Sequence, residues 1–219
     1  NLSDTKVLVE LISRFGIKFT LKKLQGMYSI SVFDKKNNFL YLARDFFGKK
    51  PLYYFHDNDQ IFFSSTLLPI IKNSEIKKEI NPEALGYYFN YGFCPTEKSI
   101  FKNIKKLSPN SYLQFNLNSW ELLQFEIHKK TKTDKFVNEF EFNKVETLLV
   151  NSVEKRLISD VPVSLLLSSG IDSSLVSYYA SQINKNIDTY TVGFSNSLYD
   201  ESEDGKRIAN YFGLKNNTI

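Results

Sequence analysis

The sequence predicts two domains, an α+β domain with antiparallel strands followed by an α/β domain with a parallel sheet. Short apolar segments joined by tight polar turns occur between residues 27 and 64, which is typical of antiparallel pairing. Helical and strand patterns alternate over residues 145–212, which is typical of parallel strands with helical crossovers. A polar segment without periodicity, residues 129–140, is the predicted linker, so the predicted domains are residues 1–128 and 141–219.

The first domain shows clear helix and strand signals. Ser3 and Asp4 are good N-caps for a helix whose apolar residues recur at helical spacing before Gly16. Residues 27–33 have little polarity on either face and predict a strand that is buried on both sides. The other predicted elements are short helices at residues 19–24 and 82–90, and strands at residues 39–43, 52–56, 61–64, 112–115 and 122–126.

The second domain is predicted as helix, strand, helix, strand and helix. The strands are residues 163–167 and 188–194, and helical patterns precede, separate and follow them. An α/β domain whose first strand-to-helix loop lies near residue 170 is expected to continue beyond residue 219. The sequence is therefore expected to be a piece of a longer protein.

Composition narrows the functional classes. The chain is 42% hydrophobic and 24% charged, and its net charge of +4 is spread out, which does not favour nucleic-acid binding. The single cysteine, Cys94, excludes an internal disulfide and fits a reducing compartment. His56 and His128 lie far apart, which argues against a zinc site. No apolar run approaches the roughly 20 residues of a membrane span, so we expect a soluble, cytoplasmic protein without nucleic-acid or membrane partners.

The turn after residues 163–167 carries most of the chemical information. A buried strand, a turn of serines and glycine, and then a helix form an anion pocket, because backbone N–H groups and the helix N-terminus face the ligand. Ser168, Ser173 and Ser174 add hydroxyl donors. Asp172 beside a phosphate requires a bridging cation, which predicts magnesium-bound pyrophosphate. A serine-rich turn in which Ser or Asp simply caps the helix remains an alternative.

This turn resembles the S-G-G-x-D-S loop of the N-type ATP pyrophosphatases, with Ser169 where that family usually carries its first glycine. Serine lacks the freedom of glycine at positive φ, so the turn is either αR or β at this position or strained. The resemblance implies that Asp172 holds Mg²⁺ and that the backbone of Val192 meets the adenine, although Val192 as a plain core residue stays open. The ATP-binding residues that it implies are Leu167, Ser168, Ser169, Gly170, Ile171, Asp172, Ser173 and Val192.

The first domain carries motifs that look like those of class II glutamine amidotransferases. They are Q-G-M-Y-S-I-S-V-F-D at residues 25–34, A-R-D-F-F-G-K-K-P-L-Y-Y at 43–54 and I-K-K-L-S-P at 104–109. Followed by the pyrophosphate loop, they make the chain similar to glutamine-hydrolysing asparagine synthetases. This resemblance implies the C-terminal part of an Ntn-type antiparallel αββα glutaminase domain, joined to the start of a parallel-sheet adenine-nucleotide-hydrolase-like domain.

In this family an N-terminal cysteine releases ammonia from glutamine, and the second domain adenylates aspartate so that ammonia displaces AMP. The resemblance therefore implies glutamine, aspartate and ATP as substrates, with Mg²⁺, and asparagine, glutamate, AMP and pyrophosphate as products; a homodimer stays open. Asp4 matches an aspartate that binds the amino group of glutamine, although Lys6 replaces a glutamate of that motif and an N-cap explains Asp4 equally. The nucleophile is expected upstream of this chain, because Cys94 has no free α-amino group to act as base.

Two other functions stay open, an amidotransferase for another carboxylate and a non-catalytic ATP-binding paralogue. Ser169, Lys6 and Thr66, which stands where the family often has glutamate, favour the paralogue. Arg44 and Asp45 look functional, but a buried structural ion pair would explain them equally. We expect this chain by itself neither to hydrolyse glutamine nor to make asparagine.

Overall fold

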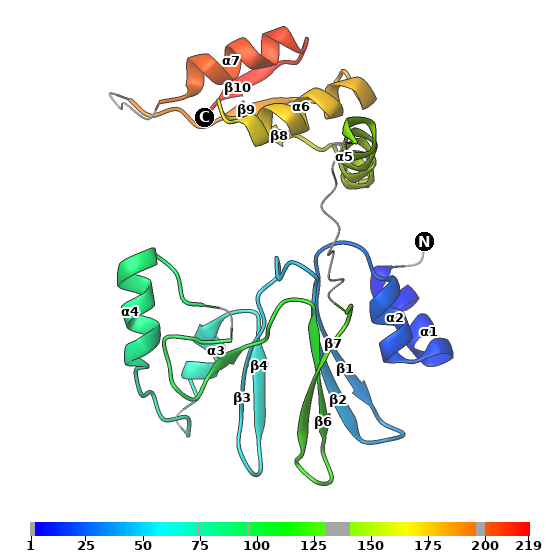
Figure 1. Cartoon of the computed structure of the whole chain (residues 1–219), viewed down its shortest axis with the longest axis vertical. Helices are drawn as coiled ribbons and strands as arrows, with labels where there is room; N and C mark the ends of the chain where they lie inside the picture. The colour runs from blue at the N-terminus through cyan, green and yellow to red at the C-terminus, as the bar shows by residue number, and fades with distance from the viewer. Residues whose placement is uncertain (1–2, 74, 96, 130–140, 196–199) are drawn as a thin grey trace. The chain divides into compact units, whose positions relative to one another are not determined.

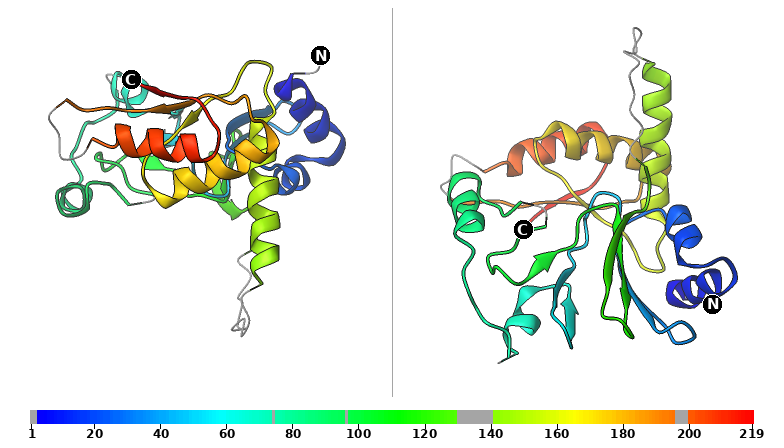
Figure 2. Two further views of the ribbon diagram at one scale, coloured as in Figure 1. Left: turned by 90° about the horizontal axis from the view of Figure 1, so that it is seen from above. Right: turned by 60° about the horizontal axis from the view of Figure 1, so that its bottom comes forward.

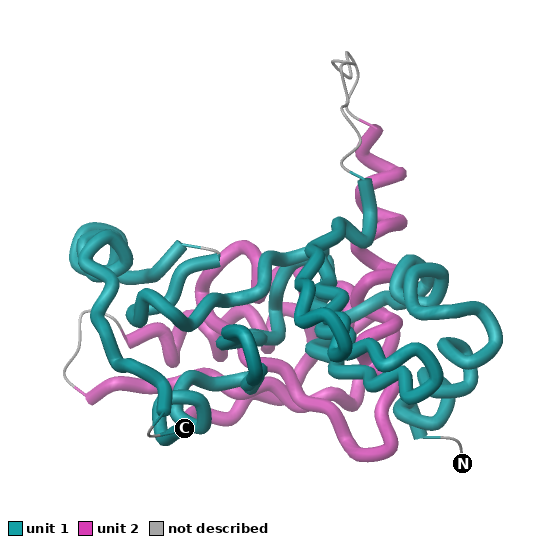
Figure 3. Tube along the Cα trace, turned by 90° about the horizontal axis from the view of Figure 1, so that it is seen from below, with its two compact units in different colours: residues 1–132 teal, residues 133–219 magenta. Residues whose placement is uncertain are grey.

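The computed structural model divides into two compact units, residues 1–132 and 133–219, which are coloured separately in Figure 3. Most of the predicted linker, from residue 130 to residue 140, lies outside the described residues. The described residues are 3–73, 75–95, 97–129, 141–195 and 200–219.

A four-stranded antiparallel sheet forms the centre of unit 1 (Figure 1). Its order is β1-β2-β6-β7, and every neighbouring pair is antiparallel, which confirms the predicted pairing. The β1–β2 turn is held by the Asp34 carboxylate, which accepts hydrogen bonds from the N–H groups of Lys36 and Asn37. The strands are β1 (Ser29–Asp34), β2 (Phe39–Arg44), β6 (Ser111–Asn116) and β7 (Leu122–Glu126).

Strand β1 corrects one prediction. It is not buried on both sides, because Ser31 and Phe33 are exposed and Phe33 is 51% accessible. β1 lies at the sheet edge, and the hydrophobic cluster that includes Ile30 and the fully buried Leu21 covers only its other face. Apolar residues on both faces of a short strand therefore did not mean burial on both faces.

Helices α1 (Asp4–Phe15) and α2 (Ile17–Lys23) precede the sheet. The Ser3 side chain caps α1 by accepting a hydrogen bond from the N–H of Lys6. Gly16, at φ 78°, ends α1 and begins α2, so the second helix starts two residues before its predicted position. Positive φ is readily available to glycine, which allows the chain to turn and re-enter a helix at once.

A second, three-stranded sheet has the order β4-β3-β5. Leu52, Tyr54 and Leu107 from this region share a hydrophobic cluster with Leu42 and Phe115 of the first sheet. The sequence predicted β3, β4 and α4 but not β5 or α3, which are too short to show a period. The elements are β3 (Tyr53–His56), β4 (Ile61–Ser64), β5 (Lys105–Lys106), α3 (Leu67–Ile71) and α4 (Pro82–Tyr91).

Unit 2 contains a parallel sheet of order β10-β9-β8, which confirms the predicted α/β character. Helix α7 contacts β9 and β10 (Figures 1 and 2), and the rings of Tyr178 in α6 and Phe212 just after α7 are 5.6 Å apart. The sequence did not predict β10. The elements are α5 (Phe142–Leu157), β8 (Leu165–Leu166), α6 (Ile171–Ile183), β9 (Thr189–Thr191), α7 (Ser202–Tyr211) and β10 (Asn216–Thr218).

Among the described residues, none of the helices combines the length and the apolar character that crossing a membrane requires.

Candidate functional site

The predicted pyrophosphate loop leaves the sheet at the carboxyl end of β8. The N–H of Leu167 donates to the carbonyl oxygen of Tyr190 at 2.8 Å, and the carbonyl oxygen of Leu167 accepts from the Thr191 hydroxyl at 2.8 Å. Both polar backbone atoms of Leu167 are thus fixed by β9. The base of the loop is rigidly placed at the sheet edge where α/β proteins bind ligands.

Serine hydroxyls hold the turn together. The Ser173 hydroxyl accepts from the N–H of Ser168 at 3.2 Å and lies 2.8 Å from the Ser168 hydroxyl. The Ser168 hydroxyl also accepts from the N–H of Gly170, and the Ser174 hydroxyl donates to the Gly170 carbonyl oxygen. The predicted hydroxyl donors are therefore engaged in fixing the loop itself.

The start of α6 presents backbone N–H groups without a side-chain cap. Its N-cap is Gly170, whose extended backbone (φ −70°) precedes Ile171 and which has no side chain to offer. The alternative in which Ser or Asp caps this helix is therefore not seen. Uncapped N–H groups in a first turn, together with the positive end of the helix dipole, favour an anion.

Asp172 lies in that first turn with an exposed side chain. Its carboxylate makes no hydrogen bond or ion pair with any residue that the structure describes, so it is available to a cation. Within the described ranges, no group of three or more His, Cys, Asp or Glu side chains could hold a metal ion. A cation at Asp172 would need phosphate oxygens and water to complete its shell, which fits Mg²⁺ bound to a nucleotide.

Ser169 adopts the serine-compatible geometry and not the strained one. The non-glycine residues with positive φ among those described do not include Ser169. Its hydroxyl donates a hydrogen bond at 2.8 Å to Oε1 of Glu201, 32 residues further along the chain. The departure from glycine is therefore accommodated without backbone strain.

A cavity of about 220 Å³ opens beside the loop. Val192 lines it and is 47% exposed, so it is not a plain core valine. The structure brings Leu167, Ser168 and Val192 to this one cavity. Glu201, which sequence reasoning did not single out, also lines it, and its bond to Ser169 joins it to the loop. The lining residues are Leu166, Leu167, Ser168, Tyr190, Thr191, Val192, Phe194 and Glu201.

Asp4, the predicted glutamine-binding residue, lies in unit 1 in the first turn of α1. Ser3 is the N-cap, so capping is not the role of Asp4. The Asp4 carboxylate is exposed and has no hydrogen-bonding or ionic partner among the described residues. It is therefore free to pair with an ammonium group.

Comparison with known proteins agrees with this architecture. Residues 1–126 match the family model described as a glutamine amidotransferase domain. The chain belongs to the glutamine amidotransferase family. Residues 144–219 match the asparagine synthase family, so this amidotransferase carries the start of a second matched domain on the same chain.

Curated relatives that align with nearly the whole of this chain are named as glutamine-hydrolysing asparagine synthetases. A protein of Methanocaldococcus jannaschii named putative asparagine synthetase [glutamine-hydrolyzing] 2 is 34% identical over 96% of this chain and 41% of its own length. Asparagine synthetase [glutamine-hydrolyzing] 1 of Bacillus subtilis is 33% identical over 98% of this chain and 34% of its own length. The chain thus spans about two-fifths or less of the length of these relatives.

Among solved structures, the glutamine phosphoribosylpyrophosphate amidotransferase of B. subtilis in complex with ADP and GMP aligns with a TM-score of 0.37. Its sequence identity is 12%, and the alignment covers 99% of this chain and 54% of that chain. Similarity at this level does not establish a common fold.

Arg44 of the amidotransferase unit is buried and has a structural role. Its guanidinium donates hydrogen bonds to the carbonyl oxygens of Gly48, Lys50 and Leu107. A side chain at Gly48 would collide with this guanidinium, since an added Cβ would lie 2.9 Å from it. Arg44 therefore ties the segment after β2 to the segment before β6.

Asp45 is also buried, and the structure shows no ion pair between it and Arg44, which was one of the two alternatives. Its carboxylate accepts hydrogen bonds from the backbone N–H groups of Phe47, Lys49 and Lys50. Burial opposes ionisation, but these donors outweigh it and hold the pKa of Asp45 below its usual value. The Arg44 and Asp45 side chains of the ARD motif therefore hold the backbone of residues 47–50 in place, and Arg44 also holds Leu107.

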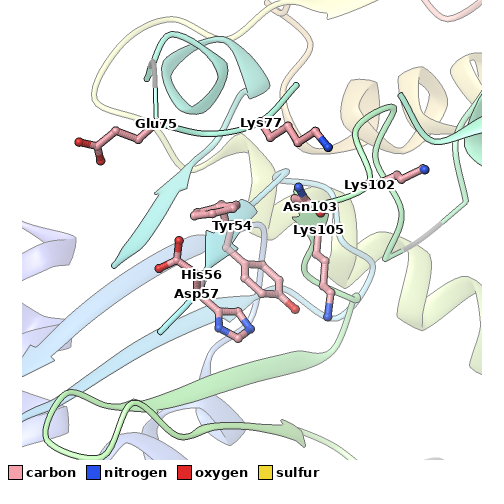
Figure 4. A pocket seen from close by; sticks show the side chains of 9 residues that line it. Tyr54, His56, Asp57, Glu75, Lys77, Lys102, Asn103 and Lys105 are labelled. Carbon is pink, nitrogen blue, oxygen red and sulfur yellow. The ribbon is translucent and has the colours of Figure 1, made fainter. Parts of the chain in front are cut away.

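A larger cavity of about 440 Å³ lies in the amidotransferase unit beside β3 (Figure 4) and contains none of the predicted site residues. The Tyr54 and His56 rings are stacked 6.3 Å apart, and Lys105 also lines the cavity. Burial and Lys105 lower the pKa of His56, and burial raises the pKa of Tyr54 to about 12. Lys102 on its rim is paired with Glu79, so this cavity has no strong excess of positive charge.

Proposed function

We propose that this chain is part of an ATP-dependent ligase that adenylates aspartate and amidates it with ammonia from glutamine. The products are asparagine, glutamate, AMP and pyrophosphate. The observation that carries the proposal is the order of the two matched domains, with an uncapped serine-glycine loop at the start of the second. The whole reaction is a proposal, because the chain spans only part of the relatives that bear this name.

In unit 2, we assign the ATP phosphates to the loop from Leu167 to Ser173. Three features support this assignment: the N–H groups of the first turn of α6 lack a side-chain cap, the serine hydroxyls fix the turn, and β9 fixes its base. The half-exposed Val192 lines the neighbouring cavity, where the adenine would lie. Donors that are fixed before the ligand arrives stabilise charge without reorganising.

We assign Mg²⁺ to Asp172, whose carboxylate is exposed and unpartnered among the described residues. Bound there, Mg²⁺ would neutralise negative charge on the phosphate groups, so that pyrophosphate is a better leaving group. The contribution of the chain is to keep this carboxylate at the helix start, next to the uncapped N–H groups.

In unit 1, we assign the amino group of glutamine to Asp4, because its carboxylate is exposed and free. We assign a structural role to Cys94, because its thiol is half-buried and its Sγ lies 3.7 Å from the carbonyl oxygen of Ala84. We therefore assign no nucleophile to the residues in this chain.

The same proposal includes the domain organisation. The boundaries are residues 1–128, 129–140 and 141–219, with an Ntn-type αββα arrangement for the first domain and an adenine-nucleotide-hydrolase-like arrangement for the second. The proposal also includes a cytoplasmic location for the protein. It includes a homodimer as the oligomeric state, which sedimentation would test.

The test is an assay of the full-length protein with ATP, Mg²⁺, glutamine and a panel of carboxylates. Asparagine formed with one AMP per turnover supports the proposal. AMP formation with a different carboxylate only would assign the protein to another amidotransferase activity. No AMP from any acceptor would leave a non-catalytic, ATP-binding paralogue.

A further inference from the structure

The cavity beside the pyrophosphate loop is lined by apolar side chains and by one carboxylate. Leu166, Val192 and Phe194 give it accessible apolar side chains. The carboxylate is that of Glu201, at the N-terminus of α7. A carboxylate next to a phosphate site is repulsive unless it serves a group that donates hydrogen bonds.

Asp200, the acidic residue next to Glu201, has a structural role that Glu201 does not share. Asp200 shapes the chain, because its carboxylate accepts hydrogen bonds from the N–H of Phe194 and from the N–H and hydroxyl of Ser202. Among the residues that the structure describes, Glu201 accepts one hydrogen bond, from the Ser169 hydroxyl to Oε1. Its Oε2 has no partner among the described residues, and α7 receives no side-chain cap from it. The described residues therefore leave most of the acceptor capacity of this carboxylate unused.

We propose that Glu201 recognises the ribose hydroxyls of the nucleotide, an inference that rests on the proposed ATP site. The phosphates belong to the first turn of α6 and the base to Val192, so the sugar that joins them lies between. Glu201 lines the cavity that Val192 lines, and it is one hydrogen bond away from the phosphate-binding turn. A carboxylate that accepts from vicinal hydroxyls is a common mode of ribose recognition.

Ser169 is the positioning residue for this carboxylate. Its hydroxyl fixes Oε1, which leaves Oε2 free to accept from a hydroxyl of the ligand. A glycine at this position, as in the resembling loops, would leave the glutamate side chain to choose among several rotamers. Serine in place of glycine at position 169 therefore contributes to nucleotide specificity and does not indicate a degenerate loop.

Isothermal titration of the full-length protein with Mg-ATP and with Mg-2′,3′-dideoxy-ATP tests the proposal. The wild type should bind ATP about tenfold to a hundredfold more tightly than the dideoxy analogue, because hydrogen bonds to a charged acceptor are strong. Glu201→Ala should bind ATP more weakly than the wild type by that factor. Its affinity for the dideoxy analogue should not change, so that it binds both nucleotides alike. Glu201→Gln, which keeps the side-chain shape, should retain a smaller preference for ATP. The control, Glu203→Ala, changes an exposed glutamate in the first turn of the same helix and should behave as wild type.

Ser169→Ala and Ser169→Gly separate positioning from direct binding. Both should reduce the preference for ATP only in part, since the carboxylate remains but is no longer held. Equal binding of the two nucleotides by the wild type, or an unchanged preference in Glu201→Ala, would overturn the inference while ATP binding still supported the proposed function. No binding of ATP to the folded wild type would instead remove the nucleotide site, and both proposals with it.

Discussion

The Thr191 hydroxyl donates a hydrogen bond to the carbonyl oxygen of Leu167, and both residues are buried. The side-chain amide of Asn216 donates in turn to the hydroxyls of Thr189 and Thr191. A polar network thus lies beneath the proposed pyrophosphate loop, in the interior of unit 2. Buried polar groups are costly when they lose a partner, so the network makes the position of the loop sensitive to single atoms.

Thr191→Val should therefore loosen the base of the loop. It keeps the shape of the side chain but leaves the Leu167 carbonyl oxygen without its donor, at a cost of about 1–3 kcal/mol. Hydrogen exchange, followed on peptides that cover residues 163–175, should accelerate by about fivefold to 150-fold. Thr218→Val, an exposed position on β10, is the control and should leave exchange unchanged. Equal rates in wild type and Thr191→Val would show that the hydrogen bond does not stabilise the loop.

Gly205→Ala should destabilise α7 although alanine is the better helix former. An added Cβ would lie 2.4 Å from the Thr191 hydroxyl, so the helix must shift. We expect a net loss of about 1–2 kcal/mol, because overpacking exceeds the gain in helix propensity. Gly86→Ala in α4 is the matched control, since its Cβ meets nothing within 4 Å, and it should stabilise α4 by about 0.5–1 kcal/mol. Amide exchange rates in the two helices should move in opposite directions, and slower exchange in α7 would contradict the steric argument.

Local signals explain what the sequence predicted. Ser3 and Gly16 bound α1, and the Asp34 turn closes the first hairpin, because capping and turn chemistry act within a few residues. Two-residue β5 has no periodicity of its own and forms because β3 offers it an edge. The polar strand Asn216–Thr218 likewise exists only through its pairing with β9.

The candidate site divides in the same way. The strand–turn–helix of the loop is a local pattern, so its residues could be named from the sequence. The bond between Ser169 and Glu201 joins positions 32 residues apart, and no local pattern predicts such a contact. The structural role of Arg44 was undetermined for the same reason, since one of its carbonyl partners, Leu107, lies 63 residues away.

Asp45→Asn should remove a pH-dependent part of the stability of unit 1. The folded pKa of Asp45 is lowered, so its contribution is present above the unfolded value of about 3.9 and is lost as the pH falls through the folded value. At pH 7 the variant should be less stable by about 1–3 kcal/mol, and the difference should shrink below pH 4.

Urea unfolding followed by fluorescence of the single tryptophan measures this, because the Trp120 ring packs 5.3 Å from Phe115 in the core of unit 1. Other carboxylates titrate equally in both proteins, so the difference isolates Asp45. Glu121→Gln, at an exposed position, is the charge-matched control. A difference that stayed constant from pH 7 to pH 3 would exclude the role given to the Asp45 charge.

Arg44→Lys should be far from conservative. Lysine cannot reproduce the planar arrangement of donors that satisfies three carbonyl oxygens, so we expect a loss of at least about 2 kcal/mol in the same tryptophan-detected unfolding. Arg14→Lys is the control, because the one partner of Arg14 among the described residues is Glu10, in an exposed ion pair, and it should change stability by less than about 0.5 kcal/mol. Similar losses in the two variants would argue against this role of Arg44.

Asp172→Asn should reduce the dependence of ATP binding on Mg²⁺. In the wild type, the carboxylate at the start of α6 repels the phosphates unless a cation intervenes, so ATP should bind more tightly with Mg²⁺ than with EDTA. In the variant the repulsion and the cation ligand are both removed, so ATP should bind at least as well as wild type in EDTA and more weakly than wild type in Mg²⁺. Asp160→Asn, another exposed position in unit 2, should retain the wild-type response. Because the Asp172 side chain has no partner among the described residues, folding should not change, and a uniform loss of affinity in both buffers would exclude Asp172 as the cation ligand.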